Sequence, residues 1–118
     1  MLQNQELISC ETLFGILPGR DRSIECIGFS GSEKAYLISK IYLQLRTSIL
    51  VIVSSAKEGE RLLDDLVFFT GNPEVPILFF PPYNILPFKF LPYHNETAGH
   101  RISVLYNLLE TGVPSIVV

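Results

Sequence analysis

Short apolar runs that alternate with helix-like segments constrain the fold of this chain most. The run SILVIV at 48–53 is nearly continuous and rich in β-branched residues, which is typical of a strand covered on both faces in a parallel sheet. Similar runs occur at 23–29, 75–80 and 114–118. Their alternation with helices predicts an α/β domain with a parallel sheet, right-handed crossovers and helices on both faces. We expect the 48–53 strand to lie centrally.

The segments between these runs carry helical signals. In the helix expected after the first strand, five apolar residues share one stripe and should face the sheet: Leu37, Ile38, Ile41, Tyr42 and Leu45. A capping box, Ser55 followed by Glu58, predicts where the next helix begins, and Gly71 where it ends. Its apolar face should hold Leu62, Leu63, Leu66, Val67 and Phe69.

Two further helices are expected nearer the ends of the chain. One spans about 4–13 and is followed by a turn at 17–20, and the other spans about 97–109 and stops at Gly112. The last apolar run breaks off at Val118, where a parallel sheet would normally continue into another crossover. We therefore expect the chain to be a fragment of a longer protein.

The stretch GFSGSEKA at 28–35 departs from the phosphate-loop pattern G-x-x-x-x-G-K-[ST] at two positions. Gly28, Gly31 and Lys34 fit the pattern. Glu33 replaces the glycine beside the lysine, and its carboxylate would repel phosphate, while Ala35 removes the hydroxyl that would bind Mg²⁺. We interpret the stretch as a vestigial phosphate loop, a turn retained for packing, with Lys34 in solvent and no cofactor bound.

Composition and charge exclude several classes of protein. The chain is 47% hydrophobic and 18% charged, with a mean hydropathy of +0.33, so it should fold and present some apolar surface to a partner. Its net charge of −3 argues against strong sequence-independent binding to DNA or anionic lipid. Cys10 and Cys26 form no metal or redox motif, and no signal peptide or membrane-length run is present. We expect a soluble, cytoplasmic protein.

No residues stand out as catalytic or metal-binding. Asp64 and Asp65 are adjacent, so on a helix they point about 100° apart and do not share a site. His94 and His100 match no zinc spacing and have no cysteine near them. We therefore predict no catalytic residue and no metal site.

The connection at 81–93 is rich in proline and aromatic residues. Aromatic side chains can stack on single-stranded bases, but one lysine is a weak electrostatic footprint for nucleic acid. We favour an ordered loop that packs on a neighbouring domain. The candidate interface residues are Tyr83, Leu86, Pro87, Phe88, Phe90 and Tyr93.

Three stretches, taken in order, resemble the amino-terminal segment of bacterial transcription-repair coupling factors (Mfd), which is itself similar to the first domain of UvrB. They are GFSGSEKAYLISK, SILVIVSSAKEGERLLDDLVFF and FFPPYNILPFKFLPYHNETAGHRISVLYNLL. The resemblance covers about 26–118. Its most specific parts are RLLDDLVFF, the Leu-Pro-Phe group at 86–88 after Tyr83, and the RISVLYNLL helix that begins at Arg101.

The resemblance implies a truncated P-loop NTPase fold of the RecA/UvrB type. The chain would be a single domain, with an N-terminal helix and turn at 1–22 and the core at 23–118. It also implies a large ATP-driven DNA translocase that displaces stalled RNA polymerase and recruits nucleotide excision repair through UvrA. ATP and Mg²⁺ would belong to a motor far downstream, because the family's loop in this segment is degenerate, as Glu33 and Ala35 are here.

The expected function is a catalytically silent scaffold. Its partners would be the other domains of the same parent chain and, through the parent, UvrA, RNA polymerase and DNA, with no membrane. The alternative is an active small P-loop enzyme, such as a nucleotide kinase with an unusual loop.

Overall fold

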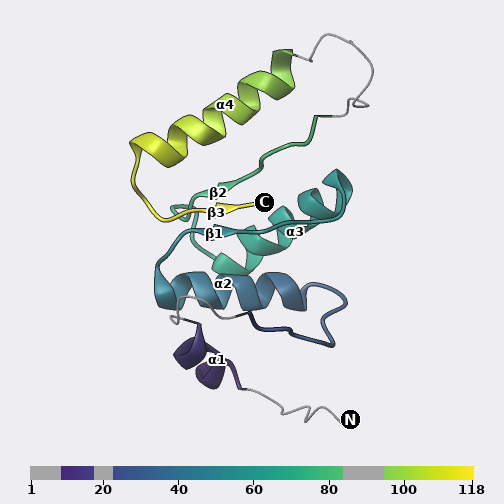
Figure 1. The fold of residues 1–118 in the computed structure, drawn as a ribbon, viewed down its shortest axis with the longest axis vertical. Coiled ribbons are helices and arrows are strands. Elements are labelled where there is room, and N and C mark those ends of the chain that lie inside the picture. The colour runs from purple at the N-terminus through teal and green to yellow at the C-terminus, as the bar shows by residue number, and fades with distance from the viewer. Residues whose placement is uncertain (1–8, 18–22, 84–94) are drawn as a thin grey trace.

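The structure, a computed structural model, describes residues 9–17, 23–83 and 95–118. Helices and short strands alternate along most of this part of the chain (Figure 1). The elements are α1 (Cys10–Ile16), α2 (Glu33–Leu45), β1 (Ile49–Leu50), α3 (Ala56–Thr70), β2 (Ile77–Leu78), α4 (Asn95–Glu110) and β3 (Ile116–Val117).

The three described strands form one sheet in the order β1-β3-β2, and both pairings are parallel. Ile116 of β3 stands in register with Ile49 on one side and Ile77 on the other. Backbone hydrogen bonds continue beyond the short strands, since the Val51 N–H donates to the Val117 carbonyl at 2.7 Å and the Phe80 N–H to the Val118 carbonyl at 2.8 Å. The last strand of the chain is therefore the central one.

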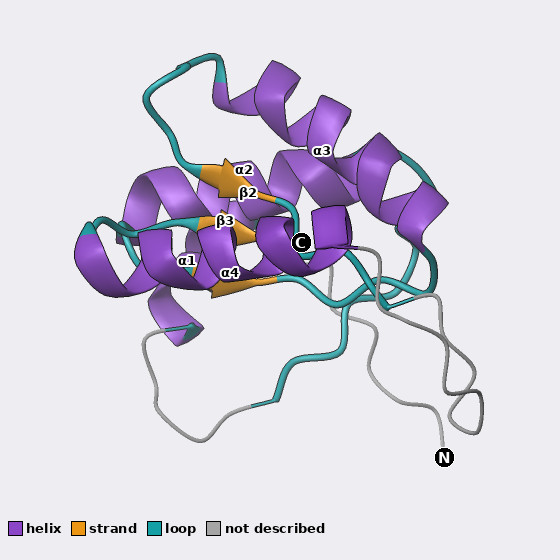
Figure 2. Ribbon diagram, turned by 90° about the horizontal axis from the view of Figure 1, so that it is seen from above, coloured by secondary structure: helices purple, strands orange, loops and turns teal. Residues whose placement is uncertain are grey.

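Helices lie on either side of this sheet, as Figures 1 and 2 show. α2 lies below the strands in Figure 1 and packs against α3, and α4 lies above the strands. The main core fills the layer between the sheet and the α2–α3 pair, where Leu66 and Ile116 are fully buried. Phe79 and Val53 pack against this core from the sheet side.

The ends of α3 follow the local signals in the sequence. The Ser55 hydroxyl accepts a hydrogen bond from the Glu58 N–H at 3.2 Å, which caps the first turn. Gly71 adopts a left-handed conformation, with φ of 59°, and ends the helix. The predicted start and end of this helix are confirmed. α4 likewise lies within two residues of its predicted bounds, and Gly112 after it has positive φ.

The predicted P-loop NTPase-like fold is wrong. The described residues are mostly helical, and three strands of two residues each make too small a sheet to show that fold. Residues 23–29, expected as the first strand, form no strand, because no described strand supplies partners for their backbone groups. Gly28 has φ of 101°, Ile27 is 71% exposed, and Cys26 is an exposed free thiol.

The run at 48–53 was expected at the centre of the sheet, but β1 lies at an edge. Every second side chain of this run faces solvent: Leu50 is 72% exposed and Ile52 is 87% exposed. Ile49, Val51 and Val53 pack against the core on the other face. The strand is therefore covered on one face only.

The buried face of α2 also differs from the predicted stripe. The buried residues are Ala35, Ser39 and Tyr42, whereas Leu37 and Ile41 are half-buried. This face packs against α3, and the Tyr42 hydroxyl donates to the Pro114 carbonyl at 2.7 Å, next to β3. On α3, Val67 was expected in the apolar face, but it is 60% exposed.

The amino-terminal helix begins later than expected. α1 starts at Cys10, because the Ser9 hydroxyl accepts a hydrogen bond from the Thr12 N–H at 3.3 Å and caps the helix there. The rest of the predicted helix, at 4–8, and most of the predicted turn, at 18–20, lie outside the described residues.

Candidate functional site

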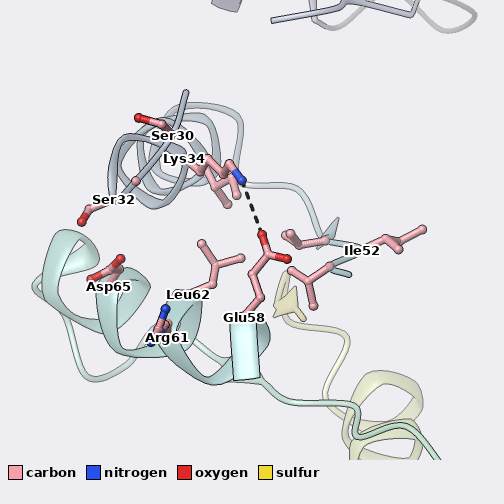
Figure 3. Close-up of a pocket in the computed structure, with 12 residues that line it drawn as sticks. Ser30, Ser32, Lys34, Ile52, Glu58, Arg61, Leu62 and Asp65 are labelled. Carbon is pink, nitrogen blue, oxygen red and sulfur yellow. Dashed lines mark hydrogen bonds and ion pairs between the residues drawn. The ribbon is translucent and has the colours of Figure 1, made fainter. Parts of the chain in front are cut away.

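The vestigial phosphate loop lines a pocket of about 590 Å³ between α2, α3 and the end of β1 (Figure 3). The loop contributes Ser30, Gly31 and Ser32, and α2 contributes Lys34. The opposite wall comes from the first turns of α3. Its side chains there are Glu58, Arg61, Leu62 and Asp65. The pocket thus brings the predicted loop residues together with acidic and basic groups from a second helix.

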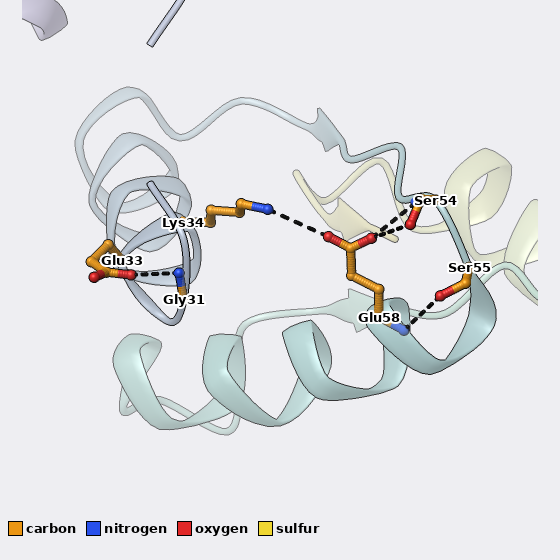
Figure 4. A network of polar contacts seen from close by, with 6 residues as sticks. All are labelled: Gly31, Glu33, Lys34, Ser54, Ser55 and Glu58. Carbon is orange, nitrogen blue, oxygen red and sulfur yellow. Dashed lines mark hydrogen bonds and ion pairs between the residues drawn. The ribbon is translucent and has the colours of Figure 1, made fainter. Parts of the chain in front are cut away.

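The carboxylate of Glu33 folds back onto its own loop. Its Oε2 accepts a hydrogen bond from the Gly31 N–H at 2.8 Å (Figure 4). In a phosphate loop, such backbone N–H groups bind the anion. The carboxylate packs closely on this residue: a side-chain carbon added at Gly31 would lie only 3.0 Å from the same oxygen. Glu33 therefore occupies the Gly31 N–H donor. The sequence had predicted only that its charge would repel phosphate.

Lys34 is likewise occupied. Its Nζ lies 3.4 Å from Glu58 Oε1, and the two side chains are 48% and 40% exposed. The sequence predicted a lysine in solvent, but the fold brings α3 opposite the start of α2 and supplies a carboxylate. An exposed pair of this kind adds little stability, yet it neutralises the one loop cation suited to phosphate.

Glu58 is itself fixed by the residue before the α3 cap. Its Oε2 accepts hydrogen bonds from the Ser54 hydroxyl at 2.6 Å and the Ser54 N–H at 3.1 Å (Figure 4). These bonds, followed by the contact with Lys34, lower the pKa of Glu58 below its ordinary value. The carboxylate is therefore ionised at neutral pH and is poorly suited to act as a general acid. In the predicted capping box it would have reached Ser55 instead.

The position at which the phosphate-loop pattern has its Mg²⁺-binding hydroxyl does not face the pocket. Ala35 is fully buried in the core and does not line the pocket. A hydroxyl at this position would lie among apolar side chains, so it would not face a ligand. Of the paired aspartates, Asp64 is exposed and only Asp65 lines the pocket. In the part of the chain that the structure describes, no three His, Cys, Asp or Glu side chains gather to hold a metal.

Comparison with known proteins assigns no family to this chain. No protein-family model matches the chain, and neither curated proteins nor solved structures give a significant match. The resemblance to transcription-repair coupling factors therefore stays a prediction from the residues quoted above. Within residues 9–17, 23–83 and 95–118, no helix combines the length and the apolar character needed to cross a membrane.

The predicted interface loop is described only at its beginning. Tyr83 is 41% exposed, whereas the other candidates lie outside the described residues: Leu86, Pro87, Phe88, Phe90 and Tyr93. The contact between this loop and the remainder of a parent chain stays a prediction.

Arg101 joins the described start of that loop to α4. Its guanidinium carbon lies 3.8 Å from the centre of the Phe80 ring and 4.3 Å from that of Tyr83. Its Nη1 donates to the Pro81 carbonyl at 2.6 Å. Stacking between a cation and two rings, with a hydrogen bond at the same end, fixes the segment against the helix. The sequence analysis did not predict this role. The available signal was an arginine at the start of the predicted helix RISVLYNLL and a group of aromatic residues about 20 positions earlier.

Proposed function

We propose that this chain is a catalytically silent interaction domain that scaffolds a transcription-repair coupling factor. The observation that carries the silent part of the proposal is the carboxylate of Glu33 on the Gly31 N–H. The family assignment rests on the ordered resemblance of residues 26–118 to the amino-terminal segment of these proteins.

Two loop groups suited to hold phosphate, the Gly31 N–H and the Lys34 ammonium, are both matched by carboxylates of the chain itself. A nucleotide would have to displace Glu33 from the amide and compete with Glu58 for Lys34. Both displaced carboxylates would then lie beside the incoming negative charge, which raises the free energy of the complex further. The loop therefore works as a closed turn between residues 23–29 and α2.

In this proposal the domain acts through contacts. Its immediate partners are the other domains of the parent chain, with the proline-rich loop at 81–93 as the contact surface. UvrA, RNA polymerase and DNA are partners of the parent, and ATP and Mg²⁺ serve the parent's downstream motor. The proposal places the protein in the cytoplasm.

The decisive experiment is thermal melting of the purified chain with and without millimolar Mg-ATP. A ligand present at 100 times its dissociation constant adds about 2.7 kcal/mol of stability, so binding would be plain in the melting curve. We expect no shift. A shift that Lys34→Ala abolishes would refute the silent loop and favour the alternative, an active small P-loop enzyme.

The family assignment has its own test, which is independent of nucleotide binding. The reading frame of the intact gene should continue from this segment into a helicase-type motor. A frame that ends soon after Val118 would remove the coupling-factor assignment and leave the closed loop unaffected.

A further inference from the structure

A second pocket, of about 490 Å³, lies where the start of α2 meets α3. Its lining comes from the loop end and from both helices: Gly31, Ser32, Glu33, Tyr36 and Phe69. The rings of Tyr36 and Phe69 have their centres 5.5 Å apart and their planes at 77°, so they form two nearly perpendicular walls. Phe69 packs against the main core, and Tyr36 is 44% exposed. The pocket therefore joins one carboxylate to two aromatic rings, one of which is fixed by the core.

The carboxylate of Glu33 gives this pocket a negative charge. Its Oε2 accepts the hydrogen bond from the Gly31 N–H at 2.8 Å, which holds the group in place (Figure 4). Among the described residues, no hydrogen bond reaches its Oε1. The amino end of a helix carries roughly half a positive charge, and the full charge of the carboxylate outweighs it. The pocket is therefore suited to a cation that can donate a hydrogen bond to Oε1.

Aromatic rings attract cations through the negative charge on their faces. The chain itself uses this attraction at the Tyr36 ring, where Lys40 Nζ lies 5.4 Å from the ring centre. It uses the same attraction on the Phe80 ring, where Arg101 combines stacking with a hydrogen bond to an oxygen. A guanidinium suits two rings and a carboxylate better than an ammonium does, because it is planar, weakly hydrated and carries several N–H donors.

We propose that this pocket binds the side chain of an arginine on a partner polypeptide. The guanidinium lies against the rings of Tyr36 and Phe69 and donates to Oε1 of Glu33. The net charge of −3 favours a basic partner segment. Lys40 does not line the pocket, so its charge opposes the arginine without taking its place. This inference does not depend on the proposed function, because the pocket binds a cation whether or not the loop binds a nucleotide.

An NMR titration of the whole 118-residue chain tests the pocket. The ligand is the blocked tripeptide acetyl-Gly-Arg-Gly-amide, and we expect the amide signals of Glu33 and Tyr36 to shift with a dissociation constant on the order of 1 mM, since one exposed side chain makes the contact. The matched ligand carries citrulline, which has the shape of arginine without its charge. It should bind about fivefold more weakly, the effect of one ion pair at about 4 Å in water. Equal binding of the two peptides, or no binding of either at millimolar concentration, overturns the proposal.

Substitutions in the chain test which groups hold the arginine. Glu33→Gln should weaken binding about fivefold, because it removes the charge and keeps an oxygen. Glu60→Gln is the matched control, since Glu60 is exposed on α3 and does not line this pocket, and it should leave binding unchanged. Tyr36→Leu removes one ring and should weaken binding about two- to fivefold.

The charge of Lys40 gives a test that loss of folding cannot imitate. Lys40→Gln should strengthen binding of the arginine peptide, because it removes a like charge beside the Tyr36 ring. If Lys40→Gln weakens binding and Glu33→Gln strengthens it, the pocket takes an anion and the proposal is wrong. A trimethyllysine peptide that binds more tightly than the arginine peptide would also overturn it, since it would assign the pocket to a methylated ammonium. None of these outcomes changes the melting test with Mg-ATP.

Discussion

If the loop binds no phosphate, as proposed, the carboxylate of Glu33 should be the main reason. Replacing it by glycine frees the Gly31 N–H and removes one negative charge next to the amide. Two unit charges about 4 Å apart in water interact by about 1 kcal/mol, and the loop is exposed, so the value for water applies. A terminal phosphate with roughly two charges then gains about 2 kcal/mol, which is about a 30-fold increase in affinity.

The assay is a titration of the unsubstituted 118-residue chain and of its Glu33→Gly variant with ATP in the absence of Mg²⁺. Binding is followed by the NMR signal of the Gly31 amide. Mg²⁺ is omitted because Ala35 offers no ligand for it and lies in the core. Glu33→Gln changes the net charge equally but keeps an oxygen that can accept the same hydrogen bond, so its gain should be smaller.

Glu60→Gln is the matched control for net charge, since Glu60 is an exposed glutamate on α3 that does not line the pocket. It should leave the affinity of the loop unchanged. If Glu33→Gly binds ATP no more tightly than Glu60→Gln does, the carboxylate does not close the loop. The silence of the loop would then come from its backbone geometry.

Two further predictions concern stability. Leu66→Ala empties a fully buried site between α3 and the sheet, so the free energy of unfolding should fall by about 2.7–5 kcal/mol in a urea titration; a loss below 1 kcal/mol would contradict this placement of the core. The pKa of Glu58 is lower in the folded chain than its ordinary value of 4.5. Its bonds to Ser54 and Lys34 should therefore stabilise the fold fully above pH about 4.5 and be lost as the pH falls through the lowered pKa. The melting temperatures of the unsubstituted chain and of Glu58→Gln should differ at neutral pH and converge in acid. A difference that stays constant with pH would refute this link between the pKa of Glu58 and stability.

Local signals in the sequence determined the ends of helices. Ser55 caps a backbone N–H three residues away, and Gly71 ends α3 because it adopts a left-handed conformation that other residues adopt at a cost. Both interactions lie within one turn, so the sequence contains all the information that they need. The end of α2 shows the limit of such reasoning, because Arg46 takes the same left-handed conformation without being glycine.

Strand pairing was decided by the tertiary structure. The apolar runs around Ile49, Ile77 and Ile116 predicted where strands would lie, but the order of the strands depends on hydrogen bonds between residues far apart in the chain. The run at 23–29 has equally strand-like residues and stays unpaired. The predicted fold was wrong for this reason, since a backbone run becomes a strand only when another strand satisfies its N–H and carbonyl groups.

The candidate site divides in the same way. The sequence by itself determined that residues 28–35 depart from the phosphate-loop pattern, because Glu33 and Ala35 stand where the pattern has glycine and a hydroxyl residue. Only the tertiary structure decided that Lys34 pairs with Glu58, 24 residues away, and that Ala35 faces the core. Charged and buried groups acquire their partners when helices pack, and the packing of α2 on α3 is a property of the whole fold that no local pattern encodes.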